Sequence, residues 1–459
     1  MSQFSDRMSP LELRATLGLA SIYALRMLGL FIVLPVFAVY SEHLPGGDNH
    51  TLIGVALGAY GLTQAILQIP FGWLSDRYGR KPMIYWGLVL FALGSFIAAM
   101  ASSIYLVILG RVVQGAGAIS AVVMAFTADL TREEHRTKAM ATIGMTIGAT
   151  FAASLVLAPV LNRLLGVPGI FALTGVLALA AMAIVRWVVP DPGQSHFHSE
   201  AEASPEQFAE VLRNPDLLRL DLGVFVLHGV LMAMWVVVPF ALKNAGLPVD
   251  HHWQVYLPVL VVSVVLMVPA IIWGERGGHL KQVFLAAIAV VLASQLMLAA
   301  LLDSLWGLVI SLVVFFTGFN LLEASLPSII SRVAPVGARG TAIGIYGTVQ
   351  FLGTFVGAVA GGFLSQHFGG AAVFLSCVAL AGVWLAVAAS MTSPPAVRTR
   401  MYHVAPMDDT RASGLTRRLG ELPGVREALV KAAEGIAYLK VDVKCFDEQR
   451  ALQLLGGEA

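Results

Sequence analysis

Four ionisable side chains lie inside long apolar segments, where a charge is costly. They are Arg26, Arg111, His228 and Glu323. An ionisable group in the hydrocarbon region costs a few kcal/mol or more and usually faces a partner or a water-filled cavity. Because a desolvated carboxyl group can exchange a proton near neutral pH, we interpret Glu323 as the best candidate proton carrier. His228 and the two arginines are candidate proton-coupling or anion contacts in a central cavity.

Each of these residues also has a structural interpretation. Arg26 and Arg111 are equally typical of internal ion pairs or carbonyl contacts, and Glu323 of a permanently paired carboxylate in helix packing. His228 on an apolar helix is more often a hydrogen-bonded packing residue than a ligand. The sequence leaves these alternatives open.

Neutral polar side chains recur at four-residue spacing within three of the apolar segments. This spacing keeps side chains on one face of a helix, where they line either a water-accessible cavity or an interhelical seam. The three stripes are Tyr60, Gln64 and Gln68; Thr142, Thr146, Thr150 and Ser154, which a seam alone would explain; and Tyr346 and Gln350. With Gln114 and Asn320 from two other segments, the Tyr and Gln positions of the first and third stripes are the candidates for the wall of a substrate cavity.

The elements that position these residues are predicted from composition to be membrane-spanning helices. Of 459 residues, 57% are hydrophobic and 12% charged, whereas soluble domains carry about 25% charged residues. Apolar runs of about 20 residues match the length needed to cross a bilayer, and the ten-residue alternation of barrel strands is absent. The sequence predicts an all-α membrane protein with twelve spanning helices, near 13–40, 51–74, 82–101, 104–129, 137–163, 167–189, 216–242, 253–274, 281–301, 304–331, 338–366 and 371–391.

The positive charges of the short loops predict the orientation. One loop carries Arg77, Arg80 and Lys81, whereas residues 41–50 and 101–105 carry no Lys or Arg. Because positively charged loops stay in the cytoplasm, and because the first apolar segment is too long for a signal peptide, we expect both termini to be cytoplasmic.

A polar segment at 191–214 separates two halves of the apolar part of the chain, and a polar tail follows the second half. The tail has the alternation of a strand at 437–443, with further strands expected at 399–404 and 425–430 and helices between and after them. This β-α-β-β-α order predicts a small α+β domain. The expected organisation is an N-terminal six-helix bundle at 1–190, a cytoplasmic linker at 191–214, a C-terminal six-helix bundle at 215–393 and the tail domain at 396–459.

Two motifs resemble signatures of the major facilitator superfamily. Residues 72–81, GWLSDRYGRK, resemble the G-x-L-A-D-R-x-G-R-K sequence between helices two and three of that family, with Ser75 replacing the usual Ala. Residues 111–117, RVVQGAG, resemble its R-x-x-Q-G-x-G pattern in helix four. The resemblance extends over essentially the whole chain and is strongest to bacterial drug-efflux members, one of which carries a ferredoxin-like tail domain.

This resemblance implies two bundles that alternate access to a central site, in a bacterial inner membrane. It implies that Asp76, Arg80 and Asp129 form a charge cluster that holds the outward-open state, and that Arg111 contributes to proton coupling. The residues assigned to this conformational gate are Gly72, Asp76, Arg77, Gly79, Arg80, Lys81 and Asp129.

The predicted function is secondary active transport, as a proton-coupled exporter of small hydrophobic compounds. The antiporter pattern of helix five is imperfect, so a proton-coupled nutrient symporter is an alternative, as is a non-transporting sensor, which the intact gate disfavours. No motif indicates an enzyme, a metal site or a cofactor, and the net charge of +1 offers no nucleic-acid surface. The expected partners are substrate, protons and lipid, with a regulatory or oligomerising tail.

Overall fold

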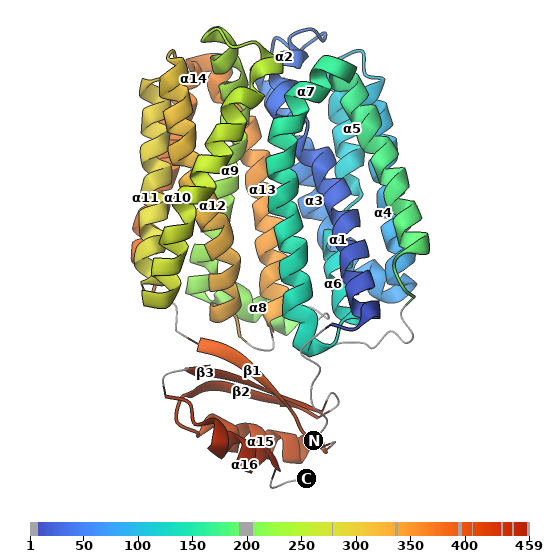
Figure 1. Cartoon of the computed structure of the whole chain (residues 1–459), viewed down its shortest axis with the longest axis vertical. Helices are drawn as coiled ribbons and strands as arrows, with labels where there is room; N and C mark the ends of the chain where they lie inside the picture. The colour runs from blue at the N-terminus through green and yellow to red at the C-terminus, as the bar shows by residue number, and fades with distance from the viewer. Residues whose placement is uncertain are drawn as a thin grey trace.

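Two groups of long helices stand side by side above a small α+β domain (Figure 1). The computed structural model describes residues 8–191, 205–277, 279–335, 338–392, 397–405, 407–432, 435–442 and 445–456. Most of the predicted linker, at 192–204, therefore lies outside the described residues. We call the side of the helices that faces the small domain the tail side, and the opposite side the far side.

The N-terminal bundle begins on the tail side. Its helices are α1 (Pro10–Phe31), α2 (Leu34–Ser41), α3 (His50–Tyr78), α4 (Arg80–Ala99), α5 (Ile104–Ala116), α6 (Ser120–Leu130) and α7 (Glu133–Trp187). Although α7 is assigned as one helix, Gly166 within it has non-helical angles, φ 66° and ψ 171°. The apolar 50 residues of α7 would measure about 75 Å at 1.5 Å per residue, more than twice a bilayer core. The chain therefore turns at Gly166 and crosses twice.

The C-terminal bundle repeats this arrangement after a short amphipathic helix. Its elements are α8 (Pro205–Arg213), α9 (Pro215–Asn244), η1 (Val249–His251), α10 (Trp253–Gly277), α11 (Leu280–Ala300), α12 (Leu305–Val333), α13 (Arg339–Phe368) and α14 (Gly370–Ala389). The described residues contain eleven segments that are long and apolar enough to span a membrane. Division of α7 at Gly166 gives the expected twelve.

Two spans that the sequence predicts as continuous helices are broken. The first is interrupted between α1 and α2, just before Pro35, whose ring and missing N–H disfavour helix continuation. The fourth is interrupted between α5 and α6 at Gly117, where a Cβ atom would lie 2.2 Å from the carbonyl oxygen of Gly87 on α4. The break therefore lets two backbones approach more closely than any side chain would permit.

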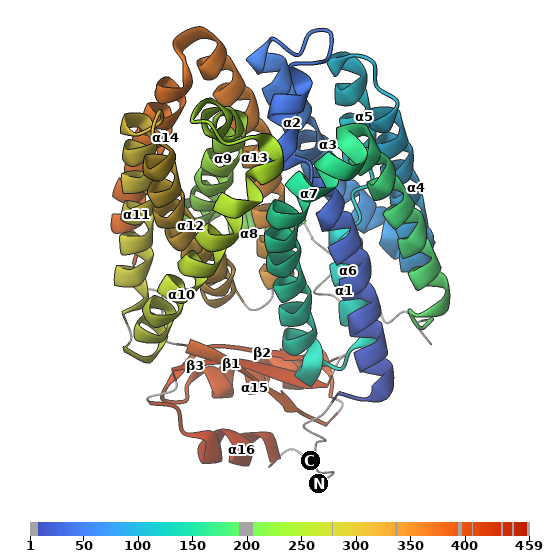
Figure 2. The same ribbon diagram turned by 45° about the horizontal axis from the view of Figure 1, so that its top comes forward.

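The tail contains β1 (Val397–His403), α15 (Asp409–Gly420), β2 (Val425–Lys431), β3 (Ile436–Asp442) and α16 (Glu448–Gly456), in the predicted order. The described strands form an antiparallel sheet with the order β1-β3-β2. The tail is therefore the small α+β domain that the sequence predicts, with three described strands. Both views place the sheet next to the ends of the membrane helices, with α15 and α16 on its other face (Figures 1 and 2).

Candidate functional site

The predicted gate contains an arginine between two carboxylates at the tail-side ends of three helices. Arg80, at the start of α4, pairs with Asp76 on α3, and its Nε donates to Oδ2 of Asp129 on α6 at 2.8 Å. Its guanidinium also donates to Oγ of Ser75 at 2.6 Å. Only 10% of the Arg80 side chain and 6% of the Asp129 side chain are exposed. Because all three helices belong to the N-terminal bundle, these contacts fasten the end of that bundle.

Two further gate residues have clear local roles. Gly79 separates α3 from α4 with φ 94° and ψ 152°, a conformation that side-chain-bearing residues rarely adopt. Lys81 donates from Nζ to the carbonyl oxygen of Val189 at 2.7 Å and pairs with Oδ1 of Asp191 at 2.6 Å. The hydrogen bond and charge of Lys81 hold the pKa of Asp191 below its usual range. Lys81 thus connects the start of α4 to the chain that leaves the bundle.

The other two predicted gate residues lie apart from the charge cluster. Arg77 is exposed, and its guanidinium lies 5.7 Å from the ring centroid of Tyr78. Gly72 faces α6, and a Cβ atom there would lie 3.7 Å from the methyl group of Ala121. That is ordinary van der Waals contact, so packing at this position tolerates a small side chain.

A second ion pair, which the sequence analysis missed, lies beside the gate. Arg132 donates from Nε to Oε1 and from a terminal nitrogen to Oε2 of Glu12, both at 3.0 Å. Glu12 also accepts from the backbone N–H of Ser9 at 2.7 Å, while Ser9 Oγ accepts from the N–H of Glu12. The spacing Ser-x-x-Glu before an apolar run is the signature of a capping box, so the helix start was visible in the sequence although the pairing with Arg132 was not.

The two predicted membrane arginines lie together in the N-terminal bundle, on either side of Tyr60. The guanidinium carbons of Arg26 and Arg111 lie 5.7 Å and 5.1 Å from the Tyr60 ring centroid. Arg26 donates to Gln64 and, at 2.7 Å, to Oγ of Ser120. Among the described residues neither guanidinium has a carboxylate partner, so amides, hydroxyls and an aromatic face replace water around two buried cations.

This packing changes the interpretation of three predicted cavity residues. Arg111 donates to Oε1 of Gln114 at 2.7 Å, and Gln114 in turn donates to Oγ of Ser95 at 2.9 Å. Tyr60, Gln64 and Gln114 are all fully buried. In this conformation they surround the arginines and supply acceptors to buried guanidinium N–H groups, so they do not line an open cavity; Nε of Arg26 is the exception and has no hydrogen-bond partner among the described residues.

The candidate proton carrier lies in the other bundle, beside the predicted histidine. Oε2 of Glu323 on α12 is 3.6 Å from Nε2 of His228 on α9, and 39% of the Glu323 side chain is exposed. The Gln350 amide on α13 lies 2.7 Å from the same Nε2, and Nδ1 of His228 is 3.2 Å from the carbonyl oxygen of Val224. A proton on Nε2 of His228 would face the Glu323 carboxylate, whereas an unprotonated Nε2 can accept from the Gln350 amide.

The remaining cavity candidates lie on α12, α13 and α3. Asn320 donates to Oγ of Ser263 at 3.2 Å, which joins α12 to α10. Tyr346 is buried, and its hydroxyl has no hydrogen-bond partner among the described residues. Gln68 lies against α13, since a Cβ atom at Gly347 would be 3.0 Å from its amide nitrogen. Only Asn320, Tyr346 and Gln350 thus share the bundle of Glu323.

Polar contacts between the two bundles are found on the far side. Nζ of Lys243, at the end of α9, is 2.5 Å from Oε2 of Glu42, which follows α2. At the start of α3, the His50 backbone N–H donates to Oε1 of Gln366 at 2.7 Å, and His50 Nδ1 lies 2.8 Å from Oγ of Ser365. None of these residues was predicted as functional, because each pair is remote in sequence.

The same side has a close seam between α3 and α13. A Cβ atom at Gly54 would lie 2.1 Å from the carbonyl oxygen of Ala358, and one at Gly61 would lie 2.9 Å from that of Phe351. The bundles are therefore in backbone contact on the far side.

Comparison with known proteins identifies the class of protein that has this gate motif, these paired bundles and these buried arginines. The chain matches the Major Facilitator Superfamily over residues 19–350 and 222–403, and it belongs to that superfamily of membrane transporters, which are not enzymes. It is 44% identical to the inner membrane transport protein YajR of Escherichia coli (strain K12), over 95% of this chain and 96% of that protein. The match and the apolar helices establish a multi-pass inner membrane transporter.

More distant relatives share less of the sequence. The chain is 28% identical to the multidrug resistance protein MdtH of Aeromonas hydrophila, over 74% of this chain and 85% of that one. A solved bacterial homologue of the lysosomal transporter Spinster, described as inward-facing and occupied, superimposes with a TM-score of 0.68 over 84% of this chain and 96% of that chain, at 15% identity. The latter similarity supports the fold alone.

Proposed function

We propose that the protein is a proton-coupled exporter of small hydrophobic compounds that works by alternating access. The observation that carries this proposal is the pairing of Glu323 with His228 within the C-terminal bundle, where the carboxylate remains 39% exposed. A membrane carboxylate that is both partly accessible and next to a titratable ring can change its proton occupancy during a transport cycle. The name of a multidrug resistance relative supports the substrate class.

We further propose that the tail side is cytoplasmic and that the structure represents the inward-open state. The positive loops of the sequence support this orientation. The contacts of Lys243 with Glu42 and of His50 with Gln366 close the far side, which is then periplasmic.

In this mechanism the two bundles close the far side and the tail side alternately. Substrate enters from the cytoplasm while Glu323 releases its proton, and the far-side contacts then separate as the tail-side ends approach. Protons from the periplasm rebind at Glu323 after the substrate leaves. The pair of Arg80 with Asp129 keeps the end of the N-terminal bundle rigid, so that the bundle moves as one body.

Proton release from inverted membrane vesicles tests the proposal. Vesicles are energised to an acidic interior, and lipophilic cations, neutral drugs and sugars are added in turn to wild type, Glu323→Gln and a control, Glu421→Gln. Glu421 lies on the exposed surface of the tail domain, with 67% of its side chain accessible, so the control makes the same chemical change away from the membrane. We expect compound-dependent proton release from wild type and Glu421→Gln only.

The other outcomes separate the alternatives. Release from all three proteins would preserve antiport but exclude Glu323 as the proton site. No release from any of them would contradict export of the tested compounds. Uptake of sugars or amino acids into right-side-out vesicles would then establish the symporter.

A further inference from the structure

The central strand of the tail domain is buried on both faces. On one face its side chains join the core under α15 and α16; these residues are Ala437, Leu439 and Val441. The other face alternates with them and is also buried, at 4–7% exposure; its residues are Ile436, Tyr438 and Lys440. An antiparallel sheet covered by helices on one face normally presents its other face to water. Here that second face points towards the membrane helices (Figure 2).

A specific polar contact joins this second face to the C-terminal bundle. Nζ of Lys440 donates to the carbonyl oxygen of Ala334 at 3.0 Å. Ala334 is the C-cap residue that follows α12, and carbonyl groups at a helix C-terminus lack internal partners and attract cations. Only 9% of the Lys440 side chain is exposed, and Oε2 of Glu427 on β2 lies 3.8 Å from its Nζ. The contact thus resembles a helix cap supplied by a separate domain.

The electrostatics agree with a buried amine at this position. Desolvation lowers the pKa of Lys440, and the neighbouring charge of Arg339, at the start of α13, lowers it further, while Glu427 opposes the shift. A buried lysine is costly unless its N–H groups are paired. The carbonyl oxygen of Ala334 and the Glu427 carboxylate provide that pairing.

The helix that Lys440 caps is the helix that carries Glu323. The short connection after α12 leads into α13, which carries Gln350 and forms the close seam with α3. Because helices transmit displacement along their axes as stiff elements, movement of α12 or α13 during the cycle changes the position of the Ala334 carbonyl. The tail domain is therefore attached to the end of a helix that moves during the transport cycle.

We propose that the tail domain is an intramolecular clamp, which docks the Lys440 face of β3 onto the tail-side end of α12 and restrains the exchange between the two transport conformations. Its partner is the C-terminal bundle of the same chain. This regulatory role rests on the proposed alternating access, but the docking itself does not, and the two are tested by separate measurements.

Distance measurement between spin labels tests the docking. One label is placed on the exposed Cys445 of the tail and another on Ser390→Cys, at the exposed tail-side end of α14, while Cys377 is buried. We expect one narrow distance distribution in this doubly labelled protein. Lys440→Glu places a carboxylate against the α12 carbonyl groups and should broaden it. Lys440→Met removes the hydrogen bond without adding a negative charge and should broaden it to a smaller extent.

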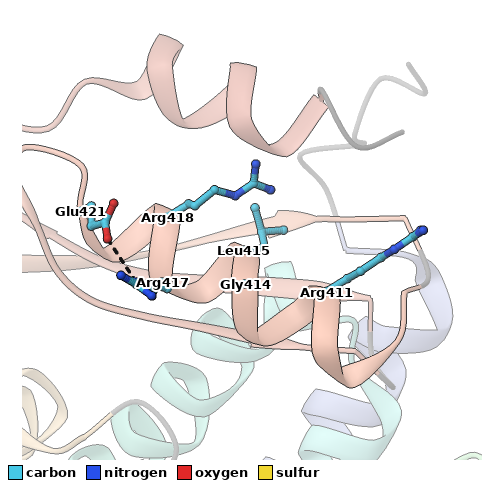
Figure 3. Close-up of a pocket in the computed structure, with 6 residues that line it drawn as sticks. All are labelled: Arg411, Gly414, Leu415, Arg417, Arg418 and Glu421. Atoms are coloured by element: carbon cyan, nitrogen blue, oxygen red, sulfur yellow. Dashed lines mark hydrogen bonds and ion pairs between the residues drawn. The ribbon is translucent and has the colours of Figure 1, made fainter.

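A matched control makes the same charge reversal elsewhere in the domain. Arg417→Glu lies on α15, where the Arg417 side chain is 84% exposed and pairs only loosely with Glu421, at 3.4 Å (Figure 3). It should leave the distribution narrow. Hydrogen exchange of the β1–β3 and β2–β3 ladders shows whether each variant keeps its sheet. If Lys440→Glu loses protection, the comparison rests on Lys440→Met and the Arg417→Glu control.

The outcomes are decisive for the clamp. A narrow distribution in both Lys440 variants with an intact sheet would refute docking through Lys440, and so would equal broadening in the Arg417→Glu control. Broadening that depends on protein concentration would assign the face to a second copy of the chain and overturn the intramolecular clamp. If docking is confirmed but transport rate in Lys440→Glu equals that of wild type, the restraint on the cycle is refuted and the proposed transport function is unaffected.

Discussion

Addition of one methyl group at Gly54 should shift the transporter away from the conformation observed here. A Cβ atom at this position would lie 2.1 Å from the carbonyl oxygen of Ala358, far inside van der Waals contact. Because backbone atoms on α13 must move to accommodate it, Gly54→Ala penalises only the state in which α3 and α13 touch. Overpacking of this kind costs about 1–3 kcal/mol, which corresponds to a population shift of about 5- to 150-fold.

A second glycine provides a control for the intrinsic effect of alanine. Alanine favours a helix over glycine by about 1 kcal/mol, but this gain is the same in both conformations. Gly382→Ala adds the same methyl group to α14, where a Cβ atom would make ordinary van der Waals contact, at 3.8 Å, with Leu292 on α11 of the same bundle. It should therefore stabilise the helix without changing the balance between the two conformations.

Spin labels on the far side measure this balance. Asp48→Cys, between α2 and α3, and Asp303→Cys, between α11 and α12, are both exposed and belong to different bundles. With Cys445→Ser in the background, we expect Gly54→Ala to populate a longer distance that wild type and Gly382→Ala lack. An unchanged distribution in a folded Gly54→Ala protein would refute the assignment of the α3–α13 seam as the far-side closure.

Three further changes have defined expectations. Asp76→Asn removes one of the two carboxylates that pair with Arg80 and should loosen the tail-side ends of α3 and α4, measured as faster hydrogen exchange there; unchanged exchange would contradict the role of this cluster in fastening that end of the bundle. Lys243→Gln removes an exposed pair with Glu42, and because such pairs contribute about 0.2–1 kcal/mol, the far-side distance population should change by less than about sixfold. Docking buries the Lys440 amine and lowers its pKa. The stabilisation of the docked state that is linked to this shift is therefore fully present above the ordinary lysine pKa of about 10.4, and it is lost as the pH falls through the lowered pKa. Spin-label distances should therefore sharpen at alkaline pH, and a Lys440→Met protein should lack that trend.

Much of the candidate site was predicted at the level of residue types. The motif at 72–81 indicated a gate, and the structure brings Asp76, Arg80 and Asp129 together across three helices. The buried ionisable residues were recognised because charges are rare in apolar segments. Their division into a cationic cluster around Tyr60 and a separate pair formed by Glu323 and His228 was not predicted, because no sequence pattern gives the rotation of one helix against another.

Residues that act through distant partners were missed for the same reason. Lys243 and Glu42 are ordinary charges near segment ends, and Lys440 is one of several lysines in a polar tail. Their importance follows from what they contact after the bundles and the tail have packed. Glycines such as Gly54 likewise give no sign in the sequence of how closely another backbone approaches.

The sequence by itself determined the membrane-spanning architecture, the two-bundle family and the order of elements in the tail, because hydrophobic length, loop charge and local periodicity are properties of contiguous residues. Only the tertiary structure decided which side is closed, which polar residues are packed around the arginines and where the tail docks. These features depend on contacts between residues far apart in the chain. Their free energies differ little between alternative packings of the same helices, so they are fixed by the fit of whole surfaces rather than by local sequence.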